Sequence, residues 1–220
     1  MAITYEDIRS NAEIRTYIAQ ADASLVALGF TEHSFAHVTK CAETASWLLL
    51  SLGYDEHQAE LAKIAGFMHD IGNVVNRNDH AQSGAVMAFR ILDKLGMDPA
   101  DVAVVITAIG YHDDKTAFPV NAVAAALLLA DKTDVRRSRV RNRETINFDI
   151  HDRVNYAVER SEVSLDRDSK TFTLSLSINT EVCAVMDYFE IFLQRMLLCR
   201  KAAGFFDLTF KLDINGLTLL

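Results

Sequence analysis

The 220-residue chain contains few cysteines, and none of them is placed for pairing. Cys41, Cys183 and Cys199 are far apart, odd in number and form no CxxC motif. This pattern is typical of reduced thiols and argues against a disulfide framework. The first ten residues, MAITYEDIRS, lack the basic and apolar regions of a signal peptide. We therefore expect a cytoplasmic protein.

Long apolar runs and an excess of basic residues are also missing. The most apolar stretch, VNAVAAALLLA, is too short to span a bilayer and runs into DKTD, so we expect a soluble chain. A formal net charge of −8 argues against general nucleic-acid binding. The chain has no GxxxxGK[ST], GxSxG, HExxH or GxGxxG motif, which leaves the P-loop, serine-hydrolase, zincin and Rossmann classes without support.

Helical spacing of apolar residues dominates the first two-thirds of the chain. With 50% hydrophobic and 24% charged residues, the composition is that of a globular protein, and the length suits one substantial domain or one domain with a smaller appendage. Caps and glycines mark where the helices begin and end. The predicted helices are residues 4–28, a helix from the cap Thr31 to Gly53, one from the cap Asp55 to Gly72, residues 80–95, one from Asp98-Pro99 to about Tyr111, and one from Asn121 to Asp131.

The pattern changes after about residue 148. TFTLSLSI and DLTFKLDI alternate in hydrophobicity, as strands with one buried face do. A turn is expected at 166–169, and a long helix, capped by Thr180 and ending near Gly204, lies between the strands. The predicted fold is mostly α: a helical bundle over residues 1–148, with a small α+β appendage over 149–220 packed on it.

Histidines and aspartates recur at or near the ends of the predicted helices. Asp131 shares a helix stripe with apolar residues, where an ionised carboxylate is costly unless a cation or several donors meet it. Taken singly, each residue has an ordinary explanation: Asp131 as a cap or a partner of Lys132, His37 as a core histidine, the others as caps or surface groups. Together they supply the imidazoles and carboxylates that two adjacent divalent ions need. The candidates are His37, His69, Asp70, His80, His112 and Asp131.

Three segments carry a resemblance to a known family. FMHDIGN, HAQSGA and ALLLADKTD resemble the motifs of the HD superfamily of metal-dependent phosphohydrolases, over roughly residues 30–140. The chain is most similar to the bacterial diadenosine-tetraphosphate hydrolases of that superfamily, and it lacks the GYP motif of the cyclic-di-GMP phosphodiesterases. The resemblance implies an HD-domain helical bundle that cleaves a small nucleotide or other phosphate ester.

The resemblance also implies roles for the candidate residues. One ion would be held by His37, His69, Asp70 and Asp131, and a second by His80 and His112, with Asp70 as the bridge. A water shared by the ions would attack phosphorus, which makes Asp70 and His69 the catalytic residues. Iron or manganese is the expected metal, while nickel, magnesium and zinc remain open.

The chain departs from the family pattern in two ways. Asn73 stands where family members often have lysine, so a positive charge is missing or comes from elsewhere. The part after residue 148 matches nothing known to us. The tract DVRRSRVRNR has arginines at 136, 137, 139, 141 and 143. It either binds substrate phosphates, forms a solvated basic segment between helices, or pairs with the acidic surface. Arg136, Arg137 and Lys132 are the substrate-binding candidates.

Some alternatives stay open at this stage. Asp113, Asp114 and His33 are placed to orient the candidate imidazoles, or are ordinary solvated residues. Three functions remain open. The chain is a phosphohydrolase, a non-catalytic HD domain that binds a ligand or partner, or an HD-type di-iron oxygenase. The expected partner is a small phosphate-containing substrate, and a homodimer is a further expectation.

Overall fold

The computed structural model describes residues 3–30, 32–141 and 150–219. They belong to two compact units, Met1–Asp131 and Lys132–Leu220. The first unit ends before residue 148, the position near which the sequence pattern changes. The 3-10 helix Arg137–Arg139 belongs to the second unit because it packs on the helix Ile150–Ala157. No helix in the described ranges is both long and apolar enough to cross a membrane.

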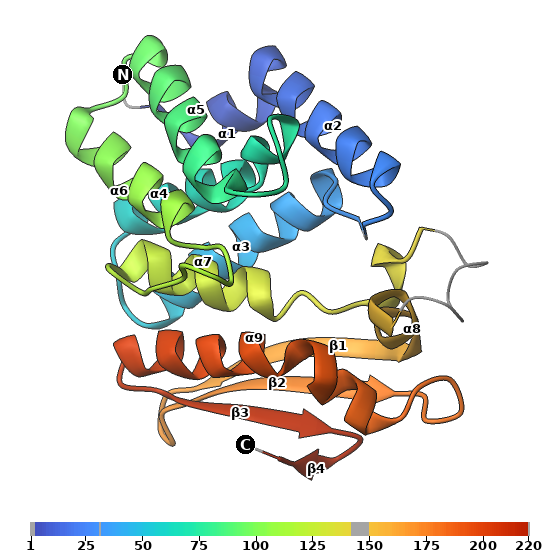
Figure 1. Ribbon diagram of the computed structural model, residues 1–220. Coiled ribbons are helices and arrows are strands. Elements are labelled where there is room, and N and C mark those ends of the chain that lie inside the picture. Colours follow the sequence, from blue (N-terminus) through green and yellow to red (C-terminus); the bar gives the residue numbers. More distant parts are fainter. Residues whose placement is uncertain (1–2, 31, 142–149, 220) are drawn as a thin grey trace. The chain divides into compact units, whose positions relative to one another are not determined.

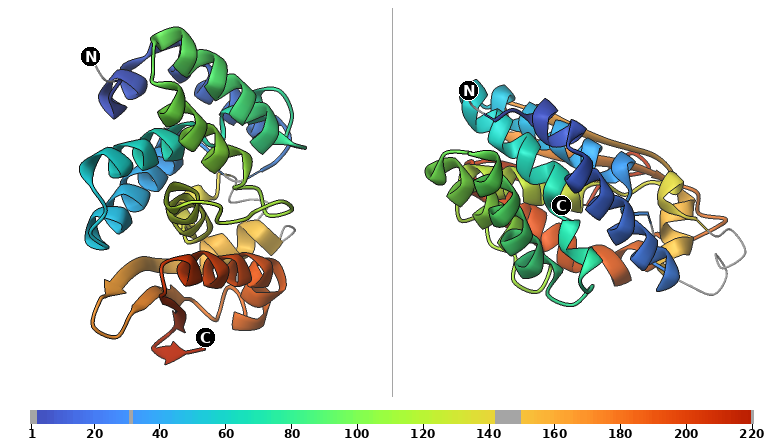
Figure 2. Two further views of the ribbon diagram at one scale, coloured as in Figure 1. Left: turned by 90° about the vertical axis from the view of Figure 1, so that its left-hand side faces the viewer. Right: turned by 90° about the horizontal axis from the view of Figure 1, so that it is seen from above.

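The described part of the first unit is helical (Figure 1). Helix α3 packs against α4 and helix α5 against α6, and the view from above in Figure 2 shows α5 and α6 side by side. The elements are α1 (Tyr5–Ser10), α2 (Ala12–Ala27), α3 (Phe35–Ser51), α4 (Glu56–Met68), the 3-10 helix η1 (Ile71–Val74), α5 (His80–Leu95), α6 (Pro99–Gly110) and α7 (Ala122–Lys132).

Side-chain caps fix where several of these helices begin, as predicted. Asp55 Oδ1 accepts a hydrogen bond from Gln58 N, and Asp98 Oδ1 accepts one from Ala100 N, both at 2.8 Å. Asn121 Oδ1 accepts from Ala124 N at 2.8 Å at the start of α7. At the end of α5, Gly96 has a φ of 82°, a left-handed conformation that glycine adopts without strain.

Three helix boundaries in this unit differ from the predicted ones. The helix expected over 4–28 is two helices, because Asn11 leaves the helical conformation and its side chain caps α2 by accepting from Glu13 N and Ile14 N. Thr31 lies outside the described residues, and the cap of α3 is Ser34. Helix α4 ends at Met68 rather than at Gly72, since the chain tightens into η1 just after the His-Asp pair.

The second unit contains a four-stranded sheet in the order β1-β2-β3-β4 (Figure 1). Strands β1 and β2 form an antiparallel hairpin, and β3 pairs parallel with β2 because α9 carries the chain back across the sheet. The elements are η2 (Arg137–Arg139), α8 (Ile150–Ala157), β1 (Val158–Asp166), β2 (Thr171–Ile178), α9 (Val185–Phe205), β3 (Thr209–Ile214) and β4 (Leu217–Thr218).

The alternating pattern correctly predicted the buried face of this sheet. Phe172 and Leu174 on β2 and Phe210 and Leu212 on β3 are buried, and the two phenylalanine rings stack with their centres 6.5 Å apart. The predicted cap of the long helix was wrong, since α9 begins after Ala184 and not after Thr180. The fold class is confirmed: mostly α, with a small C-terminal α+β part.

Candidate metal centre

The structure brings the six candidate residues together within the first unit. They come from α3, from the end of α4, from the first residue of α5, from just after α6 and from α7. The five residues other than Asp131 are buried, and the Asp131 side chain is 13% exposed. The residues are His37, His69, Asp70, His80, His112 and Asp131.

One group of ligand atoms lies on the Oδ2 side of Asp70. Asp70 Oδ2 is 3.4 Å from His69 Nε2 and 3.8 Å from His37 Nε2. Asp131 Oδ1 lies on the same side, 3.4 Å from His37 Nε2 and 3.9 Å from His69 Nε2. Two imidazoles and two carboxylates therefore meet at one point.

A second group lies on the other carboxylate oxygen. Asp70 Oδ1 is 3.5 Å from His80 Nε2 and 3.8 Å from His112 Nε2, and these two nitrogens are 3.1 Å apart. The two oxygens of Asp70 thus face two different pairs of histidines. This carboxylate lies between the two groups, and the rings of His69 and His112 also meet there, with their centres 4.9 Å apart.

Backbone carbonyls determine which histidine nitrogens face the centre. The Nδ1 atoms of His69, His80 and His112 lie 2.8, 3.0 and 2.6 Å from the carbonyl oxygens of Gly66, Arg77 and Ile109, each three residues earlier. A carbonyl can only accept, so each Nδ1 carries the proton and each Nε2 presents a lone pair.

The resulting arrangement fits divalent cations. Nδ1–H bonds of this kind are the usual support of metal-binding histidines. The lone pairs of His80 and His112 face each other at 3.1 Å, which is unfavourable unless a cation or a proton lies between them. His69 Nε2 is buried and has no hydrogen-bond partner among the described residues. A cation would satisfy His69 Nε2 and would separate the facing lone pairs of His80 and His112.

Burial and charge set the protonation of the centre. Burial lowers the pKa of His80 to about 4, with His112 and Arg77 adding to the effect of burial and Asp70 opposing it. Burial favours neutral forms of His69 and Asp70 too, but their mutual attraction outweighs it, so the pKa of His69 is raised and that of Asp70 is well below its usual range. Asp70 is therefore ionised and His80 neutral, which are the forms that bind metal.

Asn73 and Arg77 support the Oδ1 side of Asp70. Asn73 Nδ2 donates to both the carbonyl and Oδ1 of Asp70 at 2.9 Å, which fixes the carboxylate. Arg77 Nη1 donates to Asn73 Oδ1 at 3.2 Å and lies 3.3 Å from His80 Nε2. Arg77 thus places a positive charge beside the position where the sequence has Asn73 instead of lysine.

Sequence reasoning did not single out Arg77 or Cys41 at this centre. Cys41 Sγ lies 3.7 Å from both ring nitrogens of His37. The spacing of four residues from His37 was the signal, because residues i and i+4 share a helix face. Of the expected supporting residues, Asp113 Oδ1 is 3.8 Å from His80 Nδ1, and the ring of His33 is centred 5.6 Å from that of His37.

The arginine tract belongs to the second unit, where each described arginine has its own setting. Arg136 donates from Nε and Nη2 to the buried carboxylate of Asp134 at 2.7 and 3.1 Å, and from Nη1 to Ser138. Arg139 Nη1 donates to the carbonyl of Asp134 at 2.8 Å. These two arginines neutralise a buried acid. Lys132 is also buried, and Arg143 lies outside the described residues.

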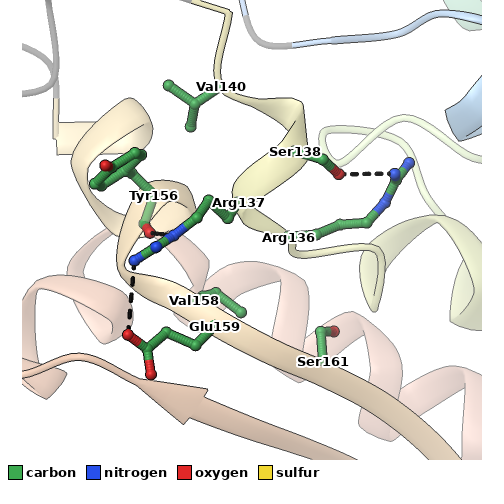
Figure 3. A pocket seen from close by; sticks show the side chains of 8 residues that line it. All are labelled: Arg136, Arg137, Ser138, Val140, Tyr156, Val158, Glu159 and Ser161. Atoms are coloured by element: carbon green, nitrogen blue, oxygen red, sulfur yellow. Dashed lines mark hydrogen bonds and ion pairs between the residues drawn. The ribbon is translucent and has the colours of Figure 1, made fainter. Parts of the chain in front are cut away.

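Arg137 has a different environment. Its Nε donates to the carbonyl of Tyr156 at 2.5 Å, and its guanidinium lies 4.4 Å from the centre of the Tyr156 ring. Nη2 is 3.8 Å from Glu159 in an exposed ion pair. Arg136, Arg137 and Tyr156 line a cavity of about 480 Å³ between η2, α8 and β1 (Figure 3). Arg137 is therefore held in place at this cavity by Tyr156. The Nη2 end of its guanidinium makes only a weak, exposed contact with Glu159.

The chain is similar to known proteins and matches the model of one protein family. An uncharacterized protein of Methanocaldococcus jannaschii, MJ1020, is 21% identical over 199 residues, which are 80% of this chain and 76% of that protein. A crystal structure described as a "predicted HD superfamily hydrolase" from an uncultured Thermotogales bacterium is 29% identical, covers 56% of this chain and 67% of its own, and has a TM-score of 0.45. A family model, the HD domain, matches residues 34–190. Since this match spans more than half of the chain, the protein belongs to the HD domain family.

Proposed function

We propose that this chain is a metal-dependent hydrolase of phosphate esters, with a small nucleotide or related ester as substrate. The proposal rests on the position of the Asp70 carboxylate, whose two oxygens face two separate pairs of histidines. A carboxylate in this position is suited to hold two ions side by side. Divalent ions in such a centre activate water and offset the charge that develops on phosphoryl oxygens.

The chain's own residues have distinct roles in this proposal. His37, His69 and Asp131 hold one ion, His80 and His112 hold the second, and Asp70 contributes to both. Asn73 keeps the Asp70 carboxylate in the orientation that separates its oxygens, through its two hydrogen bonds at 2.9 Å. The guanidinium of Arg77 offers a positive charge for a substrate phosphate next to the His80 side.

Substrate binding by the second unit is a further part of the proposal. Arg137 contributes at the cavity, since guanidinium groups bind phosphate in a bidentate manner. Arg136 supports it by holding Asp134 and Ser138, and Lys132 contributes from the end of α7. The nearest substrates by sequence resemblance are dinucleoside polyphosphates, so these belong in any screen.

The test combines metal analysis with a substrate screen. The purified chain is assayed for bound metals and then with nucleotides, dinucleoside polyphosphates and cyclic dinucleotides, both with and without oxygen. We expect hydrolysis that does not depend on oxygen. Oxygen-dependent turnover of a carbon substrate would instead identify an oxygenase, and bound metal without any turnover would leave a binding domain.

Substitutions test the role of Asp70 directly. Asp70→Asn keeps the shape of the side chain and removes its charge, so we expect loss of metal and of turnover by at least about a hundredfold. Asp93→Asn, an exposed carboxylate on α5, is the matched control and should leave both unchanged. His112→Ala should lower the metal content from two ions toward one. Full turnover in Asp70→Asn would refute the proposed mechanism.

A further inference from the structure

Cys41 shares the buried face of α3 with His37. It lies one helical turn after His37, is fully buried, and its Sγ is 3.7 Å from both nitrogens of the His37 ring. The thiol is also close to the group of ligand atoms on the Oδ2 side of Asp70. No motif of the sequence assigns a role to this thiol.

The distances in this group match those of a mixed nitrogen, oxygen and sulfur site. Ligand atoms of His37, Cys41, His69 and Asp131 all lie within 4.8 Å of one another. With nitrogen about 2.1 Å and sulfur about 2.3 Å from an ion, the angles of roughly 90–120° in four- and five-coordinate sites place the two ligands about 3.1–3.8 Å apart. The observed separation between Cys41 Sγ and His37 Nε2 is 3.7 Å.

A second observation points to a ligand at the same place. His69 Nε2 is buried in this group without a hydrogen-bond partner among the described residues, although its Nδ1 is bonded to the Gly66 carbonyl. Burying an unpaired acceptor is costly unless something binds it. The position that would satisfy His69 Nε2 is the one that the four ligand atoms surround.

Building on the metal centre of the proposed function, we propose that Cys41 binds the ion held by His37, His69 and Asp131. On binding, the S–H bond breaks, the proton passes to solvent, and the sulfur donates its electron pair to the divalent ion without any change of oxidation state. Thiolate ligands select zinc and iron over magnesium and manganese. The centre therefore takes a thiophilic divalent ion at this position.

The absorption spectrum of the cobalt-substituted protein shows whether sulfur binds the ion, independently of catalysis. Cobalt(II) bound by thiolate shows a strong charge-transfer absorption in the near ultraviolet, which nitrogen and oxygen ligands do not give. The metal-free full-length chain is titrated with cobalt(II), and the same titration is run on Cys41→Ser and on Cys199→Ser. Cys199 is an equally buried thiol on α9 and serves as the matched control.

We expect the charge-transfer band in the wild type and in Cys199→Ser, and its loss in Cys41→Ser. Zinc affinity should fall by at least about tenfold in Cys41→Ser, while magnesium affinity stays unchanged. Cys41→Ala serves if the serine variant misfolds. Cobalt binding without the band in the wild type overturns the proposal and leaves Cys41 as a core thiol that donates to His37, with the metal centre intact. Absence of any cobalt binding overturns the metal centre as well.

Discussion

Arg77 is a positive charge held close to the metal centre by its neighbours. Its Nη1 donates to Asn73 Oδ1 at 3.2 Å and lies 3.3 Å from His80 Nε2, and its guanidinium lies 5.5 Å from the centre of the Phe30 ring. The side chain is half-buried, so part of it is exposed to solvent. A phosphate approaching the His80 side would meet this group first.

Replacing Arg77 should therefore weaken catalysis without emptying the metal centre. We expect Arg77→Ala to lower kcat/KM by about ten- to a hundredfold, since a lost hydrogen bond to a charged group costs about 1.5–3 kcal/mol. Arg77→Lys should recover part of the loss, because it restores the charge but not the planar fork. Arg90→Ala, an exposed arginine on α5, is the control. Unchanged kinetics in Arg77→Ala would assign Arg77 a purely structural role.

At the scale of the element, Gly66 sets the distance between α3 and α4. A Cβ at Gly66 would lie 2.7 Å from both Cα and N of Ala42, closer than real Cβ contacts allow. These are backbone atoms of α3, so no side chain can rotate away. His37 lies on α3 and His69 directly follows α4, and their ring centres are 5.2 Å apart. Close approach of the backbones thus determines the spacing of two candidate ligands.

Gly66→Ala should destabilise the protein and weaken metal binding together. Alanine gains about 1 kcal/mol in helix propensity, but overpacking costs up to about 3 kcal/mol, so we expect a net loss of about 2 kcal/mol from the free energy of unfolding. Gly110→Ala is the control, because its Cβ would meet Ala85 Cβ at an ordinary 3.7 Å. Urea denaturation and metal titration of both variants measure the effect. Equal stability of the two variants would contradict it.

The elements that the sequence predicted well are those with a local signal. Asp55 and Asp98 cap helices through bonds to residues two or three positions away, so the cap can be read from a few letters. Asn11 was missed because the apolar spacing continues across it, although asparagine at that position caps α2. Strand β4 is two residues long and exists through its pairing with β3, a contact that no local pattern encodes.

The site shows the same limit. Candidate ligands at helix ends, such as His80 and Asp131, were identifiable because they interrupt an apolar or capped pattern. Cys41 was not, since a small apolar thiol fits the buried stripe of α3 whether or not it touches an ion. The separation of the two oxygens of Asp70 depends on the fold bringing the ends of α4, α5 and α6 together, which spacing alone does not give.

At the scale of the whole molecule, a substitution in the cavity of the second unit tests whether that unit contributes to the reaction proposed for the first. Arg137→Ala should raise KM by about tenfold and leave kcat and metal content unchanged, because a surface guanidinium contributes through phosphate contacts. Arg160→Ala, an exposed arginine on β1 paired with Glu162, is the control. Normal kinetics in Arg137→Ala would remove the second unit from substrate binding.

Metal binding should stabilise the first unit more than the second. The candidate ligands all lie in Met1–Asp131, so we expect openings that release metal to involve that unit. A ligand bound only by the folded form stabilises it by about 2.7 kcal/mol at a concentration of a hundred times Kd, which slows such openings by about a hundredfold.

Hydrogen exchange followed by mass spectrometry can locate this effect on the full-length chain. On adding metal to chelator-treated protein, we expect peptides from α3, α4, α5 and α7 to exchange up to about a hundredfold more slowly. Peptides from β1, β2 and β3 should change much less, because no ligand of the centre lies in the sheet. Asp70→Asn is the control in which metal should have no effect on any peptide. If the strands respond as strongly as α3 does, the two units open together, and metal binding stabilises the chain as one cooperative body.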